Sequence, residues 1–148
     1  MCIRDSLDDI KDPIRKMDLL ITAKNFVCPS LFMADELGKK GGKTWVYQFN
    51  RVRDDKLAKK YGAFHGAELP YVFDTHDEWL PTNKKDRELT REIQSYWLSF
   101  AKTGNPNNGD AVTWPEYDSY NDPTLVLDDE IYQRNHESSE ICKIMDLF

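Results

Sequence analysis

The sequence is short of clustered basic residues and of long apolar runs, and each shortage excludes a class of protein. Its 148 residues carry 20 Lys and Arg against 26 Asp and Glu, a formal net charge of -6. Nucleic acids and anionic membrane surfaces bind clustered Lys and Arg, whereas here the basic residues are dispersed among acids. No apolar stretch approaches the roughly 20 residues of a spanning helix, and no secretory signal pattern opens the chain. We therefore expect no nucleic-acid partner and no membrane span.

Strand signals are also scarce. The strongest lies at residues 44–49, where Trp45, Tyr47 and Phe49 alternate onto one face, as in a half-buried or central strand. A weaker pair, residues 124–127 and 131–133, flanks an acidic turn and predicts a small hairpin. A central strand needs neighbours on both sides. We therefore expect an incomplete sheet belonging to a larger domain, which disfavours a free-standing binding module.

Helices are predicted where apolar residues recur every three to four positions. The segments are 7–19 (begun or interrupted near Pro13), 22–38, 84–103 and 137–148. Thr22 is the expected cap of the second, Pro29 is an objection to it, and Gly41 and Gly42 read as a turn. In the third, Gly104 is expected to end the helix, and the charged positions, Asp86 among them, are expected to face water. Its expected buried stripe consists of Leu89, Ile93, Tyr96, Trp97, Phe100 and Ala101. Trp114 and Tyr117 are expected to pin the turn-rich segment that follows.

The segment GAFHGAELPYVF, Gly62 to Phe73, resembles the histidine segment of type-B carboxylesterases and their cholinesterase relatives. SYWLSFAKTGNPN, Ser95 to Asn107, followed by Trp114-Pro115 and Tyr117, resembles the same family in the same order. The resemblance covers roughly residues 18–148. It implies an α/β fold, the C-terminal part of an α/β-hydrolase: last main strand, histidine loop, packing helices and small hairpin in residues 7–148. MCIRDS, residues 1–6, matches nothing in the family and is set aside as a doubtful leader.

The resemblance also implies roles for individual residues. His65 takes the place of the triad histidine, and Gly66 leaves space beside its imidazole and permits backbone angles that other residues avoid. Glu68 resembles a family glutamate that orders the site from behind the histidine, and helix capping is the open alternative. Asp74 departs from the family pattern, which has glycine there.

The rest of the triad is missing. No serine stands in the G-x-S-x-G elbow that such a nucleophile needs, and the triad acid precedes the histidine in this fold, so we leave it unassigned. The resemblance implies a serine esterase without cofactor, acting on small carboxylic esters; this chain alone is expected to be inactive and to need the upstream remainder of its domain. The alternative is a non-catalytic adhesion or interaction protein of the same fold.

The remaining histidines and cysteines give weaker signals. His76, beside Asp77 and Glu78, reads as part of a surface loop and not as a metal site, and His136 reads as solvated. Cys28 and Cys142 fall where cholinesterase-like relatives carry a bridging pair. If they are bridged, a secreted or periplasmic location is favoured, because disulfides persist in oxidising compartments.

Overall fold

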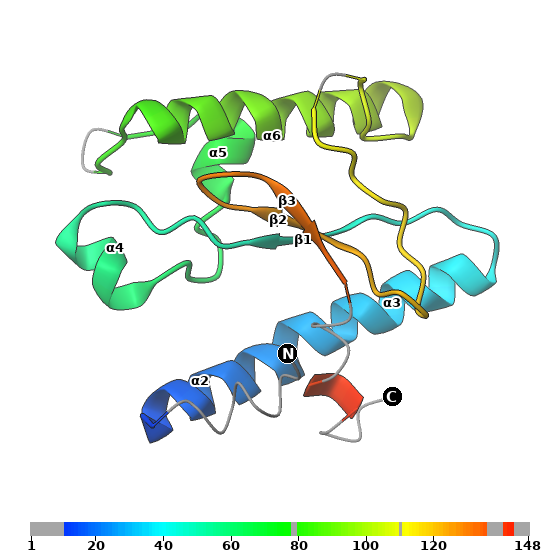
Figure 1. Cartoon of the computed structure of the whole chain (residues 1–148), viewed down its shortest axis with the longest axis horizontal. Coiled ribbons are helices and arrows are strands. Elements are labelled where there is room, and N and C mark those ends of the chain that lie inside the picture. Colours follow the sequence, from blue (N-terminus) through cyan, green and yellow to red (C-terminus); the bar gives the residue numbers. More distant parts are fainter. Residues whose placement is uncertain (1–10, 78–79, 110, 136–140, 144–148) are drawn as a thin grey trace. The chain divides into compact units, whose positions relative to one another are not determined.

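Helices outnumber strands in the computed structural model, which describes residues 11–77, 80–109, 111–135 and 141–143. The elements are α2 (Pro13–Thr22), η1 (Ala23–Val27), α3 (Cys28–Lys39), β1 (Val46–Phe49), α4 (Lys56–Tyr61), α5 (Leu69–Phe73), α6 (Lys84–Thr103), β2 (Thr124–Leu127) and β3 (Tyr132–Arg134) (Figure 1). They group into two compact units. The first holds residues 1–46, 115–124 and 133–148, and the second holds residues 47–114 and 125–132.

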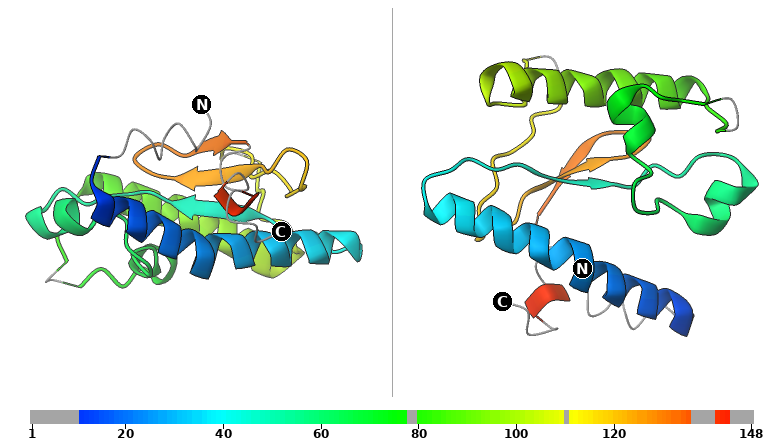
Figure 2. Two further views of the ribbon diagram at one scale, coloured as in Figure 1. Left: turned by 90° about the horizontal axis from the view of Figure 1, so that it is seen from below. Right: turned by 180° about the vertical axis from the view of Figure 1, so that it is seen from behind.

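The first unit contains one uninterrupted helix made of α2, η1 and α3 (Figure 2). Asp12 caps its start, accepting the Ile14 N–H at 2.9 Å. The prediction of two helices with Thr22 as a cap is wrong, because Thr22 has helical angles and no capping bond. At the end of the π turn, the Cys28 N–H reaches back to the Ala23 carbonyl. This wider turn comes directly before Pro29, which has no N–H to donate, and so the helix continues.

This helix bears on the expectation that the chain has no membrane span. Residues Pro13–Lys39 form 27 helical residues that are long and apolar enough to cross a membrane, with 22% of the most apolar window buried. The sequence pattern predicted two helices in this segment, with the second beginning at Thr22. Length and composition alone also fit a helix packed on protein, and Ala23, Leu31 and Ala34 are already buried in this way.

The core of the first unit is built around a disulfide between Cys28 and Cys142, whose Cα atoms lie 5.5 Å apart. Leu31 and Ile141 are buried with it, and Tyr117 packs against this cluster. The Tyr117 N–H also donates to the Thr44 carbonyl at 2.8 Å. The predicted pairing and the predicted packing of Tyr117 are both confirmed. Of the predicted last helix, residues 141–143 are helical, and the rest lies outside the described residues.

Helix α6 of the second unit has the predicted bounds. Asn83 and Asp86 form a capping box at its start, and Gly104 ends it with a left-handed φ of 73°. Leu89, Ile93 and Tyr96 are buried, whereas Phe100, predicted to belong to the same stripe, is exposed. The prediction that Asp86 faces water is wrong, because its side chain is only 1% exposed.

Aromatic side chains fill the space beside α6 in this unit. Trp114 is buried, and its ring centroid lies 5.6 Å from that of Tyr96 and 5.4 Å from that of Trp97. Tyr47 meets the same Trp114 ring edge-on at 6.0 Å. Such edge-on pairs add to the stabilisation that comes from burial. Trp114 therefore packs as predicted.

The three strands form one sheet in the order β1-β2-β3, with the predicted hairpin present. The burial of the strands is the reverse of what their sequence signals predicted. Strand β2 is buried at every position, while Tyr47 and Gln48 of β1 are exposed. Among the described residues β1 has a strand on one side only. The sheet is therefore incomplete, as expected from the shortage of strands.

Candidate functional site

The loop that carries His65 begins directly after β1. The Asn50 N–H donates to the Leu127 carbonyl at 2.8 Å, and from there the chain leaves the sheet. Asp55 caps the short helix α4, accepting the Ala58 N–H at 3.0 Å. Gly62 then closes the helix with φ 69° and a bond from its N–H to the Ala58 carbonyl at 2.7 Å. Glycine suits this position because other residues avoid left-handed angles.

His65 lies in the turn between α4 and α5, and its side chain is exposed. The Ala67 N–H donates to the Phe64 carbonyl at 3.0 Å, and the Leu69 N–H donates to the Gly66 carbonyl at 3.2 Å. Gly66 has φ 86°, so a residue with a Cβ atom would be strained there. These consecutive turns hold the backbone on both sides of the imidazole.

Glu68 stands at the N-cap position of α5, but its side chain forms no capping hydrogen bond. Its carbonyl instead accepts the N–H groups of Tyr71 and Val72 at 2.9 and 3.0 Å. The capping alternative for the Glu68 side chain therefore has no support in the geometry. Burial, with the charge of Glu68, raises the pKa of Tyr47.

The next helix end accounts for the departure at Asp74. Asp74 closes α5 in the left-handed region, with φ 51°, where the family pattern has glycine. Asp adopts this conformation more readily than most residues with a Cβ atom. Its carboxylate also pairs with Arg87 of α6 at 3.2 Å. The backbone path therefore remains that of a glycine-terminated helix.

His76 corrects a second prediction, because it lies in a polar network and not in a free surface loop. Its Nε2 is 2.7 Å from the Thr90 hydroxyl, and its Nδ1 is 3.2 Å from the Arg53 guanidinium. The Thr90 hydroxyl gives its one proton to the Asp86 carbonyl at 2.7 Å. Nε2 of His76 must therefore donate, and Nδ1 accepts from Arg53. Burial, assisted by the charges of Arg53 and Arg87, lowers the pKa of His76, which agrees with a neutral ring.

Sequence reasoning missed the most buried charges of this unit. Arg51 and Asp86 have side chains only 4% and 1% exposed, and Arg51 Nε lies 2.9 Å from Asp86 Oδ1. Burial alone raises the pKa of Asp86, but hydrogen bonds from the Asn83 backbone, Tyr71 and Arg51 outweigh it and hold the pKa below the usual value. Asp86 is therefore a carboxylate in the folded protein. The available signal was the spacing of Asn83 and Asp86, which is that of a capping box.

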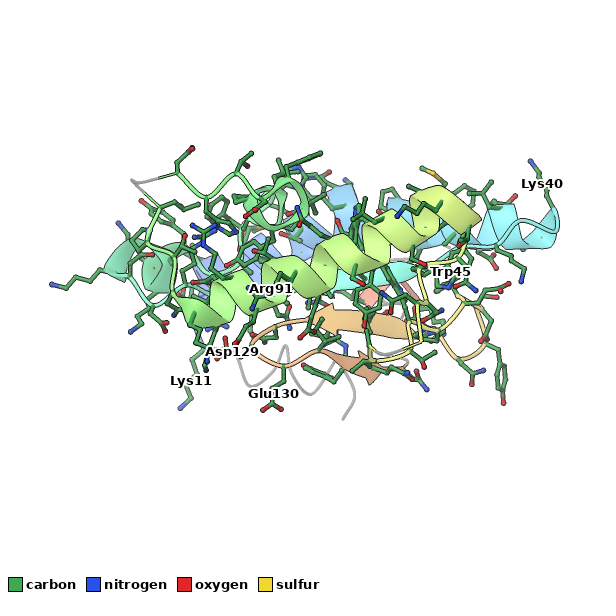
Figure 3. All side chains as sticks on the ribbon, turned by 90° about the horizontal axis from the view of Figure 1, so that it is seen from above. Lys11, Lys40, Trp45, Arg91, Asp129 and Glu130 are labelled. Atoms are coloured by element: carbon green, nitrogen blue, oxygen red, sulfur yellow. A yellow bond between two sulfur atoms is a disulfide. The ribbon has the colours of Figure 1, made fainter. Side chains whose placement is uncertain are left out.

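Two other features carry no esterase chemistry. A hollow of about 280 Å³ is lined by residues of α6 and of the turn between β2 and β3, including Lys85, Glu88, Asp129 and Glu130. Asp129 and Glu130 lie in this turn (Figure 3), and the Asp129 carboxylate pairs with Lys85 of α6 at 2.7 Å. No serine or histidine lines the hollow. Among the described residues no three His, Cys, Asp or Glu side chains gather as metal ligands. Glu78 and His136 lie outside the described residues.

Comparison with known proteins identifies the family. A model of the carboxylesterase family matches residues 3–145. The chain belongs to the carboxylesterase family. Over 101 residues it is 40% identical to para-nitrobenzyl esterase of Bacillus subtilis, covering 65% of this chain and 20% of that protein. It is 34% identical over 117 residues to acetylcholinesterase of Gallus gallus, covering 74% and 15%.

Solved carboxylesterase structures share the fold. A PNB esterase aligns with a TM-score of 0.63 at 34% identity, covering 71% of this chain and 22% of that one. A carboxylesterase of Geobacillus stearothermophilus aligns with a TM-score of 0.77 over 95% of this chain and 30% of its own, at 24% identity. The α/β-hydrolase fold predicted from the histidine segment is thereby confirmed. The chain spans about a fifth of the length of the relatives it matches.

Proposed function

We propose that this chain is the C-terminal part of a domain that hydrolyses carboxylic esters through an acyl-serine intermediate, with His65 as the triad histidine. The observation that carries the proposal is the setting of His65. It follows a sheet strand, lies exposed between two positive-φ glycines, and belongs to a chain whose relatives are named esterases. In an α/β-hydrolase the loop after the last main strand holds the histidine that reaches the serine.

His65 acts as general base and then as general acid. Its imidazole takes the serine proton as the oxygen attacks the ester carbonyl, and it returns a proton to the leaving alcohol. Water then attacks the acyl-enzyme with the same two proton transfers, which releases the acid and the serine. Glu68 orients the imidazole from behind. The serine, the triad acid and the oxyanion donors come from the remainder of the domain, and the mechanism needs no cofactor.

The exposed apolar side chains around His65 support the proposal that another part of the domain packs against this loop. Tyr61, Phe64, Leu69 and Phe73 of this loop and its two helices are 50–66% exposed. A single exposed apolar residue is ordinary, but several around one turn mark a contact surface. The partner in this proposal is the rest of the same domain, which would complete the pocket for a small carboxylic ester.

The disulfide supports an oxidising location. Cys28 and Cys142 close a separation of 114 residues, and such bridges persist outside the reducing cytosol. We therefore propose a secreted or periplasmic protein.

Activity of the intact domain, meaning this chain together with the rest of its fold, tests the function. Hydrolysis of p-nitrophenyl acetate and covalent labelling by a fluorophosphonate are expected for the intact domain. The 148-residue chain alone should show neither, because it lacks a G-x-S-x-G elbow. An intact domain that neither turns over the ester nor takes the label would contradict the proposal and favour a non-catalytic interaction protein.

A further inference from the structure

A polar cluster lies where the His65 loop leaves the core and returns to it. It consists of the buried side chains of Arg51, Tyr71 and Asp86 together with the exposed residue Asn83, and we call it the Asp86 cluster. Arg51 precedes the loop, Tyr71 follows it on α5, and Asn83 and Asp86 belong to the start of α6. All four lie in the second unit, with His65. Ester hydrolysis as proposed above uses none of them.

One carboxylate oxygen joins the two ends of the loop. Asp86 Oδ1 accepts from Arg51 Nε at 2.9 Å and from the Tyr71 hydroxyl at 2.7 Å. The other oxygen, Oδ2, accepts the Asn83 N–H at 2.9 Å, within the capping box of α6. The residues between Arg51 and Tyr71 thus form a closed loop whose ends meet at a residue fixed by a twenty-residue helix.

A second set of contacts holds the same ends. The Arg53 guanidinium lies 4.9 Å over the Tyr71 ring, and it donates to the Pro81 carbonyl at 3.1 Å. The centroid of the Tyr71 ring is also 5.0 Å from that of Phe49, the last residue of β1. Tyr71 is fully buried. Arg51 and Arg53, which precede His65 in the chain, are therefore both held by residues that follow it.

Stability alone does not account for such a cluster. A buried ion pair is often no more stabilising than well-packed apolar residues of the same size, because both charges lose their hydration. A carboxylate oxygen that accepts two hydrogen bonds does fix the distances and directions of both donors. Positioning of a general base within about 0.5 Å governs its efficiency. The arrangement fits a device that holds a loop in one conformation.

We infer that Asp86 is a positioning residue, which fixes both ends of the His65 loop so that the imidazole is presented in one orientation. The inference rests on the proposed function for its catalytic consequence, but the fixed loop is a property of this chain alone. In this inference Tyr71 connects the end of the loop to Asp86 through the hydrogen bond of its hydroxyl.

The test is Tyr71→Phe in the intact domain, with Tyr96→Phe as the matched control. Both changes remove the hydroxyl of a buried tyrosine; Tyr96 donates to the Val112 carbonyl at 2.6 Å, far along α6 from the loop in sequence. Asp86→Asn is a poorer probe, because it leaves Arg51 buried without its counter-ion and endangers folding. Amide hydrogen exchange of residues 54–70 and steady-state kinetics with p-nitrophenyl acetate are measured for each variant.

Tyr71→Phe should speed exchange in residues 54–70 and lower kcat about 3- to 10-fold, the size of one lost hydrogen bond, with KM unchanged. Tyr96→Phe should leave both as in the parent. Unchanged exchange in the loop of Tyr71→Phe overturns the inference, whatever the activity. Faster exchange with undiminished kcat contradicts the positioning role. If the parent itself shows no esterase activity, the proposed function fails, and loop exchange alone decides whether the Asp86 cluster fixes the loop.

Discussion

The neighbours of His76 favour the neutral form of its ring. Thr90 passes its proton to the Asp86 carbonyl, so His76 Nε2 donates to Thr90, and Nδ1 faces the Arg53 guanidinium. A second proton on Nδ1 would meet a cation. The sequence showed only a histidine next to two acids, because the partners that decide its charge lie in distant segments. Sequence patterns predict residues near one another in the chain better than such long-range polar contacts.

This environment predicts a pH-dependent stability. The pKa of His76 is lowered in the folded state, chiefly by burial and then by Arg53 and Arg87, so the unfolded chain binds a proton more readily. The contribution to stability is therefore complete above the unfolded pKa of about 6.5 and is lost as the pH falls below it. When the pH is lowered from 7.5 to 5.5, the free energy of unfolding measured in urea should fall less for His76→Gln than for the parent. An equal loss in both would contradict this account.

At the scale of elements, the bounds of α6 were predictable, whereas the helix boundary at Thr22 and the ranking of the strands were not. Gly104 and the bounds of α6 follow from local residue preferences, which act through the backbone of one short segment. The burial of β2 depends on segments distant in the sequence that pack over it. Its four residues therefore gave a weaker strand signal in the sequence than the aromatic residues of β1. The predicted helix 22–38 did include Pro29, but its continuity with the preceding helix was missed, and local propensity does not predict the π turn that joins them.

The end of α5 offers a direct test of this local logic. Asp74 has φ 51°, a conformation that costs residues with a Cβ atom about 1–2 kcal/mol. Asp74→Gly should therefore be more stable than Asp74→Ala by roughly 1 kcal/mol, measured by urea unfolding of the intact domain. Arg87→Ala, which removes the exposed partner of Asp74 at 3.2 Å, should cost less than about 1 kcal/mol. An Asp74→Ala variant as stable as Asp74→Gly would show that the turn relaxes.

At the scale of the whole molecule, the family resemblance supplied what spacing could not. The Cys28–Cys142 pairing and the fold were implied by segments that resemble carboxylesterases, and both are found. The Asp86 cluster stayed hidden, since nothing in RVRDD or in the start of α6 shows that Arg51 and Asp86 meet. Buried ion pairs become visible only once the chain is folded, because their members look like surface charges in the sequence.

The disulfide should carry a large share of stability. Replacing both cysteines, Cys28→Ser with Cys142→Ser, should lower the free energy of unfolding by about 2–5 kcal/mol, since a bridge over 114 residues restricts the unfolded chain. The measurement is urea unfolding of the variant and the parent. Peptide mapping after alkylation is the control: Cys28 and Cys142 should be alkylated only after reduction. Both thiols found alkylated in protein purified without reductant would contradict the bridge and the proposed location.

The most direct test of the account is the turnover of His65→Ala in the intact domain. His76→Ala is unsuitable as a control because it would break the network with Arg53 and Thr90; Lys59→Ala, an exposed residue of α4 in the same loop, serves instead. With p-nitrophenyl acetate, kcat of His65→Ala should fall by about 10⁴-fold or more, leaving only what binding and the oxyanion hole provide, while Lys59→Ala stays near the parent. A folded His65→Ala protein with near-parental turnover would contradict the assignment of the base.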